Sequence, residues 1–570
     1  MAGAVFALHL LMLSGLVSSE LIQNGGFENN GMDHWGHCWG FSCEVIPADD
    51  SRFGSHSLKA TGRTHSYQGP SQLVNVAPGK IYKAQSWVKI LKDKPGTIGQ
   101  TMMLEVSFEF PDGQHSYFNV ALQPLLTAGD GWVFLAGEFE TPPQNFKSAN
   151  FYYQGPEPEV DFAVDQASIT EVHVSSQWRV QTDANINKYR KSDLKITVSP
   201  ASGIDRSKVQ IRILQKTKAF PFGTCVNSWK YIDPSQTKYQ DFIHKHFNWA
   251  VLENALKWGQ LERNQGQLNY DRALKTVNGL RDHGLKVRGH NMVWSVDQYV
   301  QSWMKSMTGD TLRNTVRQHI QWTLNMTRGL LEHWDVNNEN LHGQWFQNQL
   351  HDRDFDLELF RMMYQADPYP KLFLNEYSVV GSGAATTAYR EQGMRFKNAS
   401  VHLYGMGVQS HFGRGVEPNP SLIKQRLDTL AEVGVPLWTT ELDVQNDDEN
   451  VRADWYEQAL RALYGHPAIE GILFWGFWGD IQSAGQRAGL VTGPDLHLTA
   501  AGRRVLDLFE NQWMTDETHV LSQSGDHFTV RGFHGDYELH VMYLGHQLTN
   551  LKKTFTLGKQ GNVINVNVHT

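Results

Sequence analysis

The chain has 570 residues, which is enough for roughly two to four domains and at least one large core. Its formal net charge is −8 and its sequence pI is about 6.3, and no long run of Lys or Arg occurs, which argues against nucleic acid and anionic membranes as partners. Aromatic residues make up 11% of the chain and include 18 Trp, which is typical of either large cores or sugar binding, because sugar C–H faces stack on aromatic rings.

The first element along the chain is an apolar segment. Residues 2–17 are almost wholly apolar and are followed by two serines and then by polar chain. This pattern predicts a signal peptide over residues 1–19, although its first residues lack Lys and Arg. The apolar run is too short to span a bilayer comfortably, and no later stretch is more apolar, so we expect a secreted chain that does not enter a membrane.

The cysteines and glycosylation sequons agree with secretion. Cys38 and Cys43 are close enough to close a small disulfide loop in an oxidising compartment, which leaves Cys225 as a buried free thiol in an apolar run. Three cysteines without a CxxC pair do not favour a zinc or redox site. Asn325 and Asn398 stand in Asn-x-Ser/Thr sequons and are glycan acceptors if the chain is secreted.

Residues 20–175 have the pattern of an all-β domain. Short alternating runs, such as 71–76, 82–90, 103–110 and 132–139, are separated by turn residues. Strands at this spacing predict a β-sandwich. No pair of acid and base residues stands out in this region, which indicates a binding module.

Three segments of this module resemble the carbohydrate-binding modules of the family 22 and family 4/9 group. They are residues 24–28 together with Trp35, residues 54–63 and residues 160–165. The resemblance implies a cleft for xylan or glucan on one sheet face. Arg63, Tyr67 and Tyr117 are the candidate ligand residues, and the alternative is that each is an ordinary surface or core residue.

The resemblance has two further implications for this module. Related modules often carry a ligand-contacting Glu after a pair of tyrosines, and this chain has Gln154 there. Related modules also often hold a structural calcium near the N-terminal strand, for which Glu28 and Asp165 are the candidates.

Residues 176–215 are predicted to be a connecting region, with a short helix over 185–193 and a strand over 208–214. The pattern then changes. Apolar strand-like runs alternate with helical segments from 216 to 515, which is typical of a parallel α/β fold. The eight candidate strands are 222–226, 249–252, 286–290, 334–336, 371–374, 405–408, 437–440 and 471–475. Eight such units predict a (β/α)8 TIM barrel with its active site at the C-terminal strand ends.

Polar and aromatic residues follow these strands at the ends that would meet in the barrel mouth. In chain order they are Glu253, Asn254, Lys257, Trp258, His290, Trp294, Asn338, Glu339, Asn375, Glu376, Tyr377, Gln409, His411, Glu441, Asp443, Trp475 and Trp478. Amides and Lys suit hydroxyl groups, indoles suit sugar ring faces, and carboxylates suit acid–base chemistry. No His or Asp cluster has metal-ligand spacing, so we expect no cofactor for catalysis.

The motifs around these residues resemble glycoside hydrolase family 10, the retaining endo-β-1,4-xylanases. They lie at residues 253–258, 287–294, 334–339, 374–377, 407–411 and 438–443. The resemblance implies a substrate among β-1,4-linked plant polysaccharides, with xylan first. Cellulose or a mixed glucan is the alternative substrate. A sugar-binding protein that has lost activity is a third reading, although Glu339 and Glu441 are intact.

The resemblance also implies the roles of the central residues. Glu339 is the expected acid/base and Glu441 the expected nucleophile, since retaining hydrolysis uses two carboxyl groups. Burial and repulsion from ionised Glu441 are expected to raise the pKa of Glu339. Asn338 is expected to bind the sugar 2-OH, His411 to hold Glu441, and Asp443 to orient His411. The other expected subsite residues are Glu253, Asn254, Lys257, His290, Trp294, Gln409 and Trp475.

The chain also departs from the family pattern. Asn337 stands where members usually have an apolar residue, and residues 295–298 replace the usual His-Ser-Gln, so the role of Gln298 is open. The usual second Trp after Trp475 is not clearly placed, because Ala484 and Gly485 occupy that neighbourhood. Residues 516–570 alternate strongly and predict a small β appendage without chemistry. We expect the chain to be a monomer.

Overall fold

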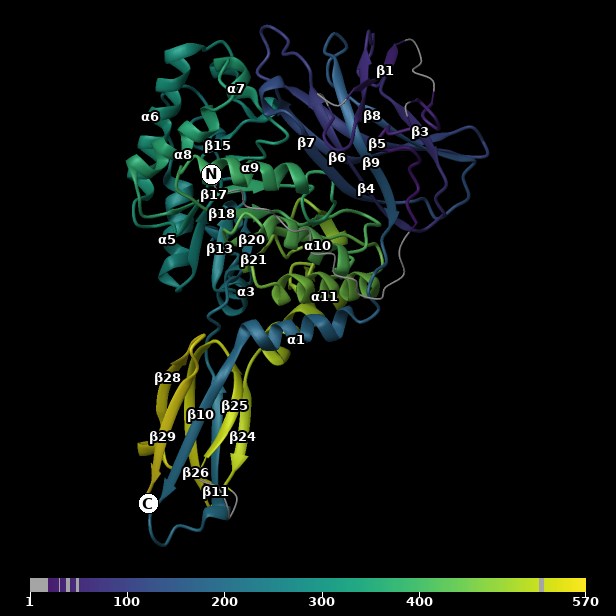
Figure 1. Cartoon of the computed structure of the whole chain (residues 1–570). Helices are drawn as coiled ribbons and strands as arrows, with labels where there is room; N and C mark the ends of the chain where they lie inside the picture. The colour runs from purple at the N-terminus through teal and green to yellow at the C-terminus, as the bar shows by residue number, and fades with distance from the viewer. Residues whose placement is uncertain (1–18, 30, 37–40, 48–50, 522–526, 570) are drawn as a thin grey trace, which may run out of the picture. The chain divides into compact units, whose positions relative to one another are not determined.

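The computed structural model describes residues 19–29, 31–36, 41–47, 51–521 and 527–569 (Figure 1). The predicted signal peptide therefore lies almost wholly outside the described residues. The chain divides into two compact units. The first extends to residue 173, and the second consists of residues 174–570 with two short segments, 93–101 and 122–127.

The first unit is a β-sandwich. One sheet has the order β1 (Ser42–Pro47), β2 (His56–Thr61), β9 (Phe162–Glu171), β4 (Ile81–Ile90) and β7 (Val133–Glu140), and the other has β3 (Ser71–Val74), β8 (Ser148–Gln154), β5 (Gln100–Glu109) and β6 (His115–Leu126). Strict alternation of burial along β4 points every second residue into the core. Phe108 of one sheet packs on Phe139 of the other, and the hydroxyls of Ser86 and Tyr153 meet at 2.7 Å between them.

The second unit contains a closed barrel of eight parallel strands, which confirms the predicted fold class. The strands are β12 (Phe222–Val226), β13 (Trp249–Leu252), β14 (Lys286–Gly289), β16 (His333–Asn338), β17 (Lys371–Glu376), β18 (Leu403–Val408), β20 (Leu437–Val444) and β21 (Ile469–Phe474). Pairing of β14 with β16 and of β12 with β21 closes the ring. Each of the eight predicted strand runs lies in or overlaps one of these strands.

Helices surround the barrel (Figure 1). The main ones are α3 (Thr237–His246), α5 (Asp271–Asp282), α6 (Gly309–Thr327), α8 (Phe355–Ala366), α9 (Thr386–Asn398), α10 (Pro420–Ala431), α11 (Glu449–Gly465) and α12 (Ala500–Asp507). Shorter elements at the barrel mouth include α2 (Ser228–Tyr231), α4 (Trp258–Leu261), β15 (Val293–Trp294), α7 (Trp345–Leu350) and β19 (His411–Phe412). Local sequence fixes some helix starts: Asn419 caps α10 through the N–H groups of Ser421 and Leu422, with proline at the first helical position.

The barrel strands are buried on both faces, which explains the short apolar runs within them. Every residue of β13, β16 and β20 is buried. Trp249, Phe373, Trp438 and Leu473 fill the barrel interior, with the rings of Trp249 and Trp438 4.8 Å apart. The interior is therefore a packed core, and only the polar strand ends open to a pocket.

A β domain at the end of the chain corrects the predicted separation of residues 191–215 from the C-terminal appendage. One of its sheets has the order β25 (His527–Phe533), β10 (Lys191–Pro200) and β29 (Asn562–Val568). The other has the order β24 (Asp516–Val520), β11 (Val209–Gln215), β26 (Gly535–Tyr543) and β27 (His546–Gln547), and β28 (Lys553–Leu557) also pairs with β26. Strands β10 and β11 come from the predicted connecting region 176–215. Residues 191–215 are therefore part of the appendage, and their strands lie among the C-terminal ones in Figure 1.

The helix before β10 joins this β domain to the barrel. Helix α1 (Trp178–Arg190) starts and ends earlier than the predicted helix over 185–193. It packs along α11 (Figure 1), and the Arg190 guanidinium donates hydrogen bonds to the carbonyls of Tyr464, His466 and Ile469. In the part of the chain that the structure describes, no helix has both the length and the apolar character needed to cross a membrane.

Candidate active site

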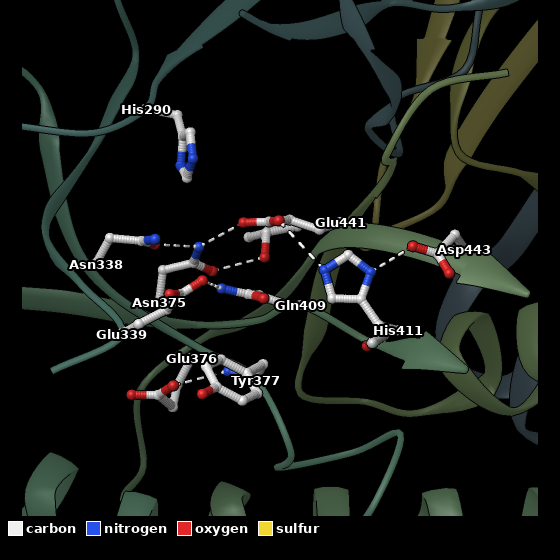
Figure 2. Close-up of polar contacts among 12 residues, drawn as sticks. His290, Asn338, Glu339, Asn375, Glu376, Tyr377, Gln409, His411, Glu441 and Asp443 are labelled. Carbon is white, nitrogen blue, oxygen red and sulfur yellow. Dashed lines mark hydrogen bonds and ion pairs between the residues drawn. The ribbon is translucent and has the colours of Figure 1, made fainter. Parts of the chain in front are cut away.

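The predicted strand-end residues meet in a pocket of about 490 Å³ at the mouth of the barrel. It is lined by Lys257, His290, Trp294, Val296, Gln298, Tyr299, Asn338, Glu339, Tyr377, Gln409, His411, Glu441, Asp443, Gln445, Trp475, Ser483 and Ala484. Figure 2 shows the carboxyl groups of Glu339 and Glu441 reaching this region from different strands. The barrel thus brings together groups that lie far apart in sequence.

Glu339 lies directly after β16 and has a left-handed backbone conformation with φ of 57°, which a non-glycine residue rarely adopts. Both of its carboxyl oxygens accept hydrogen bonds. Oε1 accepts from Gln409 Nε2 at 2.9 Å, and Oε2 accepts from the indole Nε1 of Trp294 at 2.9 Å. Burial is the largest influence and raises the pKa of Glu339, and the negative charge of Glu441 acts in the same direction, against these two hydrogen bonds.

Glu441, within β20, has the opposite balance. It is only 4% exposed, and burial alone would raise its pKa. Hydrogen bonding to His411 and Asn375 and the charge of His290 outweigh burial, so the pKa of Glu441 lies below its usual value. The two carboxyl groups therefore have pKa values that are pushed apart, the arrangement in which one is protonated while the other is ionised.

His411 connects Glu441 to Asp443. Its Nε2 lies 3.4 Å from Glu441 Oε2, and its Nδ1 forms a hydrogen bond with Asp443 Oδ2. Burial lowers the pKa of His411, but the two carboxylates outweigh it and raise the pKa to about 10. His411 is therefore a cation that donates from both ring nitrogens at neutral pH, which keeps Glu441 ionised.

Asn375 at the end of β17 forms hydrogen bonds with both Glu441 and Asn338. Its Nδ2 donates to Glu441 Oε1 at 2.9 Å and to Asn338 Oδ1 at 2.9 Å, and its Oδ1 accepts from Thr440 Oγ1 at 2.6 Å. Figure 2 shows Asn375 between these groups. The side chain is buried, so both donor contacts are shielded from water. The sequence placed Asn375 at a strand end but did not predict it as a site residue.

Lys257 and His290 are two of the predicted sugar-contacting residues that line the pocket. The Lys257 ammonium lies 4.7 Å from the centre of the Trp294 ring, and it donates to Asn254 Oδ1 at 2.9 Å. Burial lowers the pKa of Lys257, and the surrounding carboxylates, Glu441 first, act to raise it. His290 is buried, with its Nδ1 2.9 Å from Asp335 Oδ2, which leaves Nε2 for another partner.

Two predicted residues fall outside the main pocket. Glu253 lines an adjoining small pocket of about 20 Å³ together with Trp475 and Trp478, and its Oε2 accepts from Asn227 Nδ2 at 3.1 Å. Asn254 is exposed beside Lys257 and lines neither pocket. Trp475 lines both pockets.

The departures from the family pattern contact one another. Ser295 Oγ donates to Asn337 Oδ1 at 2.8 Å, and both side chains are fully buried. Asn337 Nδ2 has no hydrogen-bond partner among the described residues. Ser295 directly follows Trp294, which donates a hydrogen bond to Glu339. The buried pair of Ser295 and Asn337 is therefore adjacent in the chain to a residue that holds this carboxyl group.

Two tyrosines at the pocket, Tyr299 and Tyr377, were not predicted as subsite residues. Tyr299 stacks on Trp294 with ring centres 3.6 Å apart, and Tyr377 stacks on His342 at 3.7 Å. Gln298, whose role was open, lines the pocket beside Tyr299. Tyr377 directly follows the strand-end Glu376, so its position in the motif was a usable signal. Tyr299 ends a single 3₁₀ turn (Asp297–Tyr299) after β15, where no periodicity gives such a signal.

Comparison with known proteins identifies the two regions. Residues 211–485 match the family profile of glycosyl hydrolase family 10, and residues 19–160 match a profile described as a carbohydrate binding domain. Residues 211–485 therefore form a glycosyl hydrolase family 10 domain. Both resemblances inferred from the sequence motifs are thereby confirmed.

Several relatives of this chain are xylanases by name. Endo-1,4-beta-xylanase 1 of Arabidopsis thaliana is 30% identical over 517 residues, which are 89% of this chain and 52% of that protein. Endo-1,4-beta-xylanase 3 of the same plant is 29% identical, over 86% of this chain and 64% of that protein. The crystal structure of an intracellular xylanase from Thermoanaerobacterium saccharolyticum matches with 26% sequence identity and a TM-score of 0.47. The match covers 54% of this chain and 100% of the xylanase chain. The chain spans 52% and 64% of the length of these two plant relatives.

The carbohydrate binding domain has its own cleft of about 860 Å³ on the sheet that contains β5 and β8. It is lined by Phe41, Tyr67, Gln68, Gly69, Ser71, Glu105, Ser107, Tyr117, Asn150, Tyr152 and Gln154. Two of the predicted ligand residues, Tyr67 and Tyr117, thus line this cleft, and both rings are exposed.

The prediction that Arg63 contacts a ligand is wrong. Arg63 is 4% exposed, and its guanidinium donates to the carbonyls of Pro156, Glu157 and Val160 at 2.9, 2.7 and 3.0 Å. Since buried backbone carbonyls need hydrogen-bond donors, Arg63 holds the 156–160 loop and has a structural role.

Glu28 and Asp165 do not fit a calcium site. Glu28 Oε1 accepts two backbone N–H groups at 2.7 and 3.1 Å, and Asp165 Oδ2 accepts two more at 2.8 and 3.1 Å. N–H groups that point at these oxygens would repel a cation. Within the described residues, no group of three or more His, Cys, Asp and Glu side chains is arranged to hold a metal ion.

The remaining predicted sites are covered in part. Cys43 is disulfide-bonded and Cys225 is a buried free thiol, whereas Cys38 lies outside the described residues. Asn325 on α6 and Asn398 at the end of α9 are exposed. Glycosylation of these two residues stays a prediction.

Proposed function

We propose that this chain is a secreted endo-1,4-β-xylanase that hydrolyses internal bonds of xylan with retention of anomeric configuration. The observation that carries the proposal is the pair formed by Glu339 and Glu441. Both open into one pocket, and their surroundings shift the two pKa values in opposite directions. A protonated acid beside an ionised carboxylate is what double displacement needs.

In the first step, the Glu441 carboxylate attacks the anomeric carbon while Glu339 donates its proton to the departing glycosidic oxygen. A covalent ester forms between the sugar and Glu441, and the aglycone leaves as an alcohol. His411 and Asn375 orient Glu441 and keep it ionised before attack. Asn338, held by Asn375, is placed to bind the sugar 2-OH, and this contact strengthens as the anomeric centre flattens.

In the second step, the charge on Glu441 has been lost in the ester, so it no longer raises the pKa of Glu339. Glu339 can then take a proton from water as that water attacks the anomeric carbon and releases Glu441. The hydrogen bonds from Gln409 and Trp294 hold the carboxyl group in place through both steps.

Xylan is the proposed substrate because several relatives, among them two of Arabidopsis thaliana, are endo-1,4-β-xylanases by name. Trp294, Trp475 and Lys257 provide ring faces and a hydroxyl-binding cation beside the carboxyl pair. The carbohydrate binding domain is proposed to bind the same class of polysaccharide in its own cleft. Secretion is proposed from the apolar segment 2–17 and is supported by the disulfide at Cys43.

The proposal is tested by measuring the release of reducing ends from xylan and from carboxymethylcellulose. The unmutated chain is expected to release them from xylan, and Glu441→Gln is expected to lose at least about 10³-fold in kcat. Proton NMR of the first products should show the β-anomer. Release from carboxymethylcellulose alone would replace xylan by glucan as the substrate, and no release from either polymer would refute the enzymatic proposal.

A further inference from the structure

The cleft of the carbohydrate binding domain has a buried carboxyl group in its lining. Burial along β5 places Leu104 and Val106 in the core, and Glu105 lines the cleft on the opposite face together with Ser107. Glu105 is only 6% exposed, which is unusual for a residue that faces an open cleft. The side chain therefore lies at the base of the cleft, below more exposed neighbours.

No residue that the structure describes neutralises this carboxyl group. The structure shows no hydrogen bond or ion pair to Glu105 from any residue that it describes, and none of the other residues that line the cleft is charged. Across the strand pair, Glu105 lies opposite Tyr152, and Ser107 lies opposite Asn150. A buried carboxylate without donors is unfavourable, so this arrangement favours a ligand that supplies them.

Sugar hydroxyls are the donors that fit the rest of the cleft. The exposed rings of Tyr67 and Tyr117 offer faces for sugar C–H groups, and Asn150 and Gln154 offer amides for further hydroxyls. We propose that Glu105 is the polar anchor of this cleft and that its carboxylate accepts hydrogen bonds from two adjacent hydroxyl groups of a β-1,4-linked sugar. This inference rests on the polysaccharide binding proposed above for the domain.

The anchor makes binding depend on pH. Burial raises the pKa of Glu105 to about 7 in the free cleft. Because hydroxyl donors favour the ionised form, bound sugar lowers this pKa, and affinity falls as the pH falls below about 7. Within the described ranges, the other titratable side chains at the cleft are three tyrosines and two histidines that stack on two of them: Tyr67, Tyr117, Tyr152, His65 and His115.

The experiment titrates xylohexaose into the full-length Glu441→Gln chain by calorimetry at pH 8 and at pH 5. This parent is expected to show two classes of site, one in each unit. Glu105→Gln in the same background should weaken one class at least tenfold at pH 8, and that class should no longer change between the two pH values. Glu109→Gln is the matched control, because Glu109 lies on the same strand but pairs with Lys147 at 3.1 Å and does not line the cleft.

The parent alone already tests the anchor, since the affinity of one class should fall at least tenfold from pH 8 to pH 5 without any change at Glu105. An unchanged thermal transition shows that Glu105→Gln is folded. If both classes of site keep their affinities in Glu105→Gln, or if the pH dependence of binding persists in that variant, the proposed role of Glu105 is refuted. Sugar binding by the domain would then still stand. A single class of binding site in the parent would refute both the role of Glu105 and sugar binding by the domain. Hydrolysis of xylan by the unmutated chain is a separate readout of the proposed enzyme.

Discussion

Replacing Asn375 with Ala tests how the barrel keeps one carboxyl group ionised. Asn375 is buried and donates to Glu441 Oε1 at 2.9 Å. A hydrogen bond to a charged group contributes about 1.5–3 kcal/mol, and all of it favours the ionised form of Glu441. Its loss should lower kcat about 10- to 150-fold and raise the pKa of Glu441 by about one to two units.

The assay is the pH dependence of kcat/KM on a soluble xylo-oligosaccharide. The acid limb, which reports ionisation of Glu441, should move to higher pH, whereas the basic limb, which reports Glu339, should stay close to its original position. Thr440→Val removes only the hydroxyl that holds Asn375 at 2.6 Å and should cost less activity. Asn314→Ala on the exposed face of α6 is the control for the amide change. A folded Asn375→Ala chain with an unmoved acid limb and less than about threefold loss would refute this reasoning.

Three further changes test other contacts. Trp294→Phe keeps a ring but removes the hydrogen bond that lowers the pKa of Glu339, so the basic limb should move up by about one pH unit, and an unmoved limb would count against this contact. Ser295→Ala should lower the free energy of unfolding by about 1–3 kcal/mol, and adding Asn337→Val should restore part of the loss, whereas additive losses in denaturant titrations would contradict the pairing. Arg63→Ala should lower the melting temperature of the first unit in calorimetry, and weakened sugar binding at an unchanged melting temperature would contradict its structural role.

The barrel and the strand ends could be predicted because each depends on local pattern. Strands buried on both faces contain short apolar runs, and polar residues cluster where each strand ends, as Asn337, Asn338 and Glu339 do after 334–336. In a closed barrel of eight parallel strands, the C-terminal strand ends meet at one face, so these polar residues are expected to lie together. The same reasoning placed Asn375 at a strand end.

What the pattern could not supply is which groups touch. The role of Asn375 depends on hydrogen bonds to two other strands, and these contacts have no signal in the sequence around it. Arg63 was misinterpreted for a similar reason, since a charged residue between turn residues is usually exposed, but here its guanidinium lies among the carbonyls of a loop more than ninety residues away.

The division of the chain also depended on non-local contacts. Residues 191–200 and 209–215 precede the barrel but pair with strands after residue 515. A pass along the sequence assigns such strands to the nearest region, because their alternation does not identify their partners. Residues 191–215 were therefore separated from the β domain to which they belong.

The most direct test of the account is to trap the covalent intermediate. The full-length chain is incubated with a dinitrophenyl 2-fluoro-xylobioside, in which fluorine slows the second step more than the first. Intact mass spectrometry should show one added fluorinated disaccharide, and peptide mapping should place it on the Glu441 side chain. Inactivation without an adduct, or an adduct on another residue such as Glu339, would contradict the assignment of Glu441 as the nucleophile of a retaining enzyme.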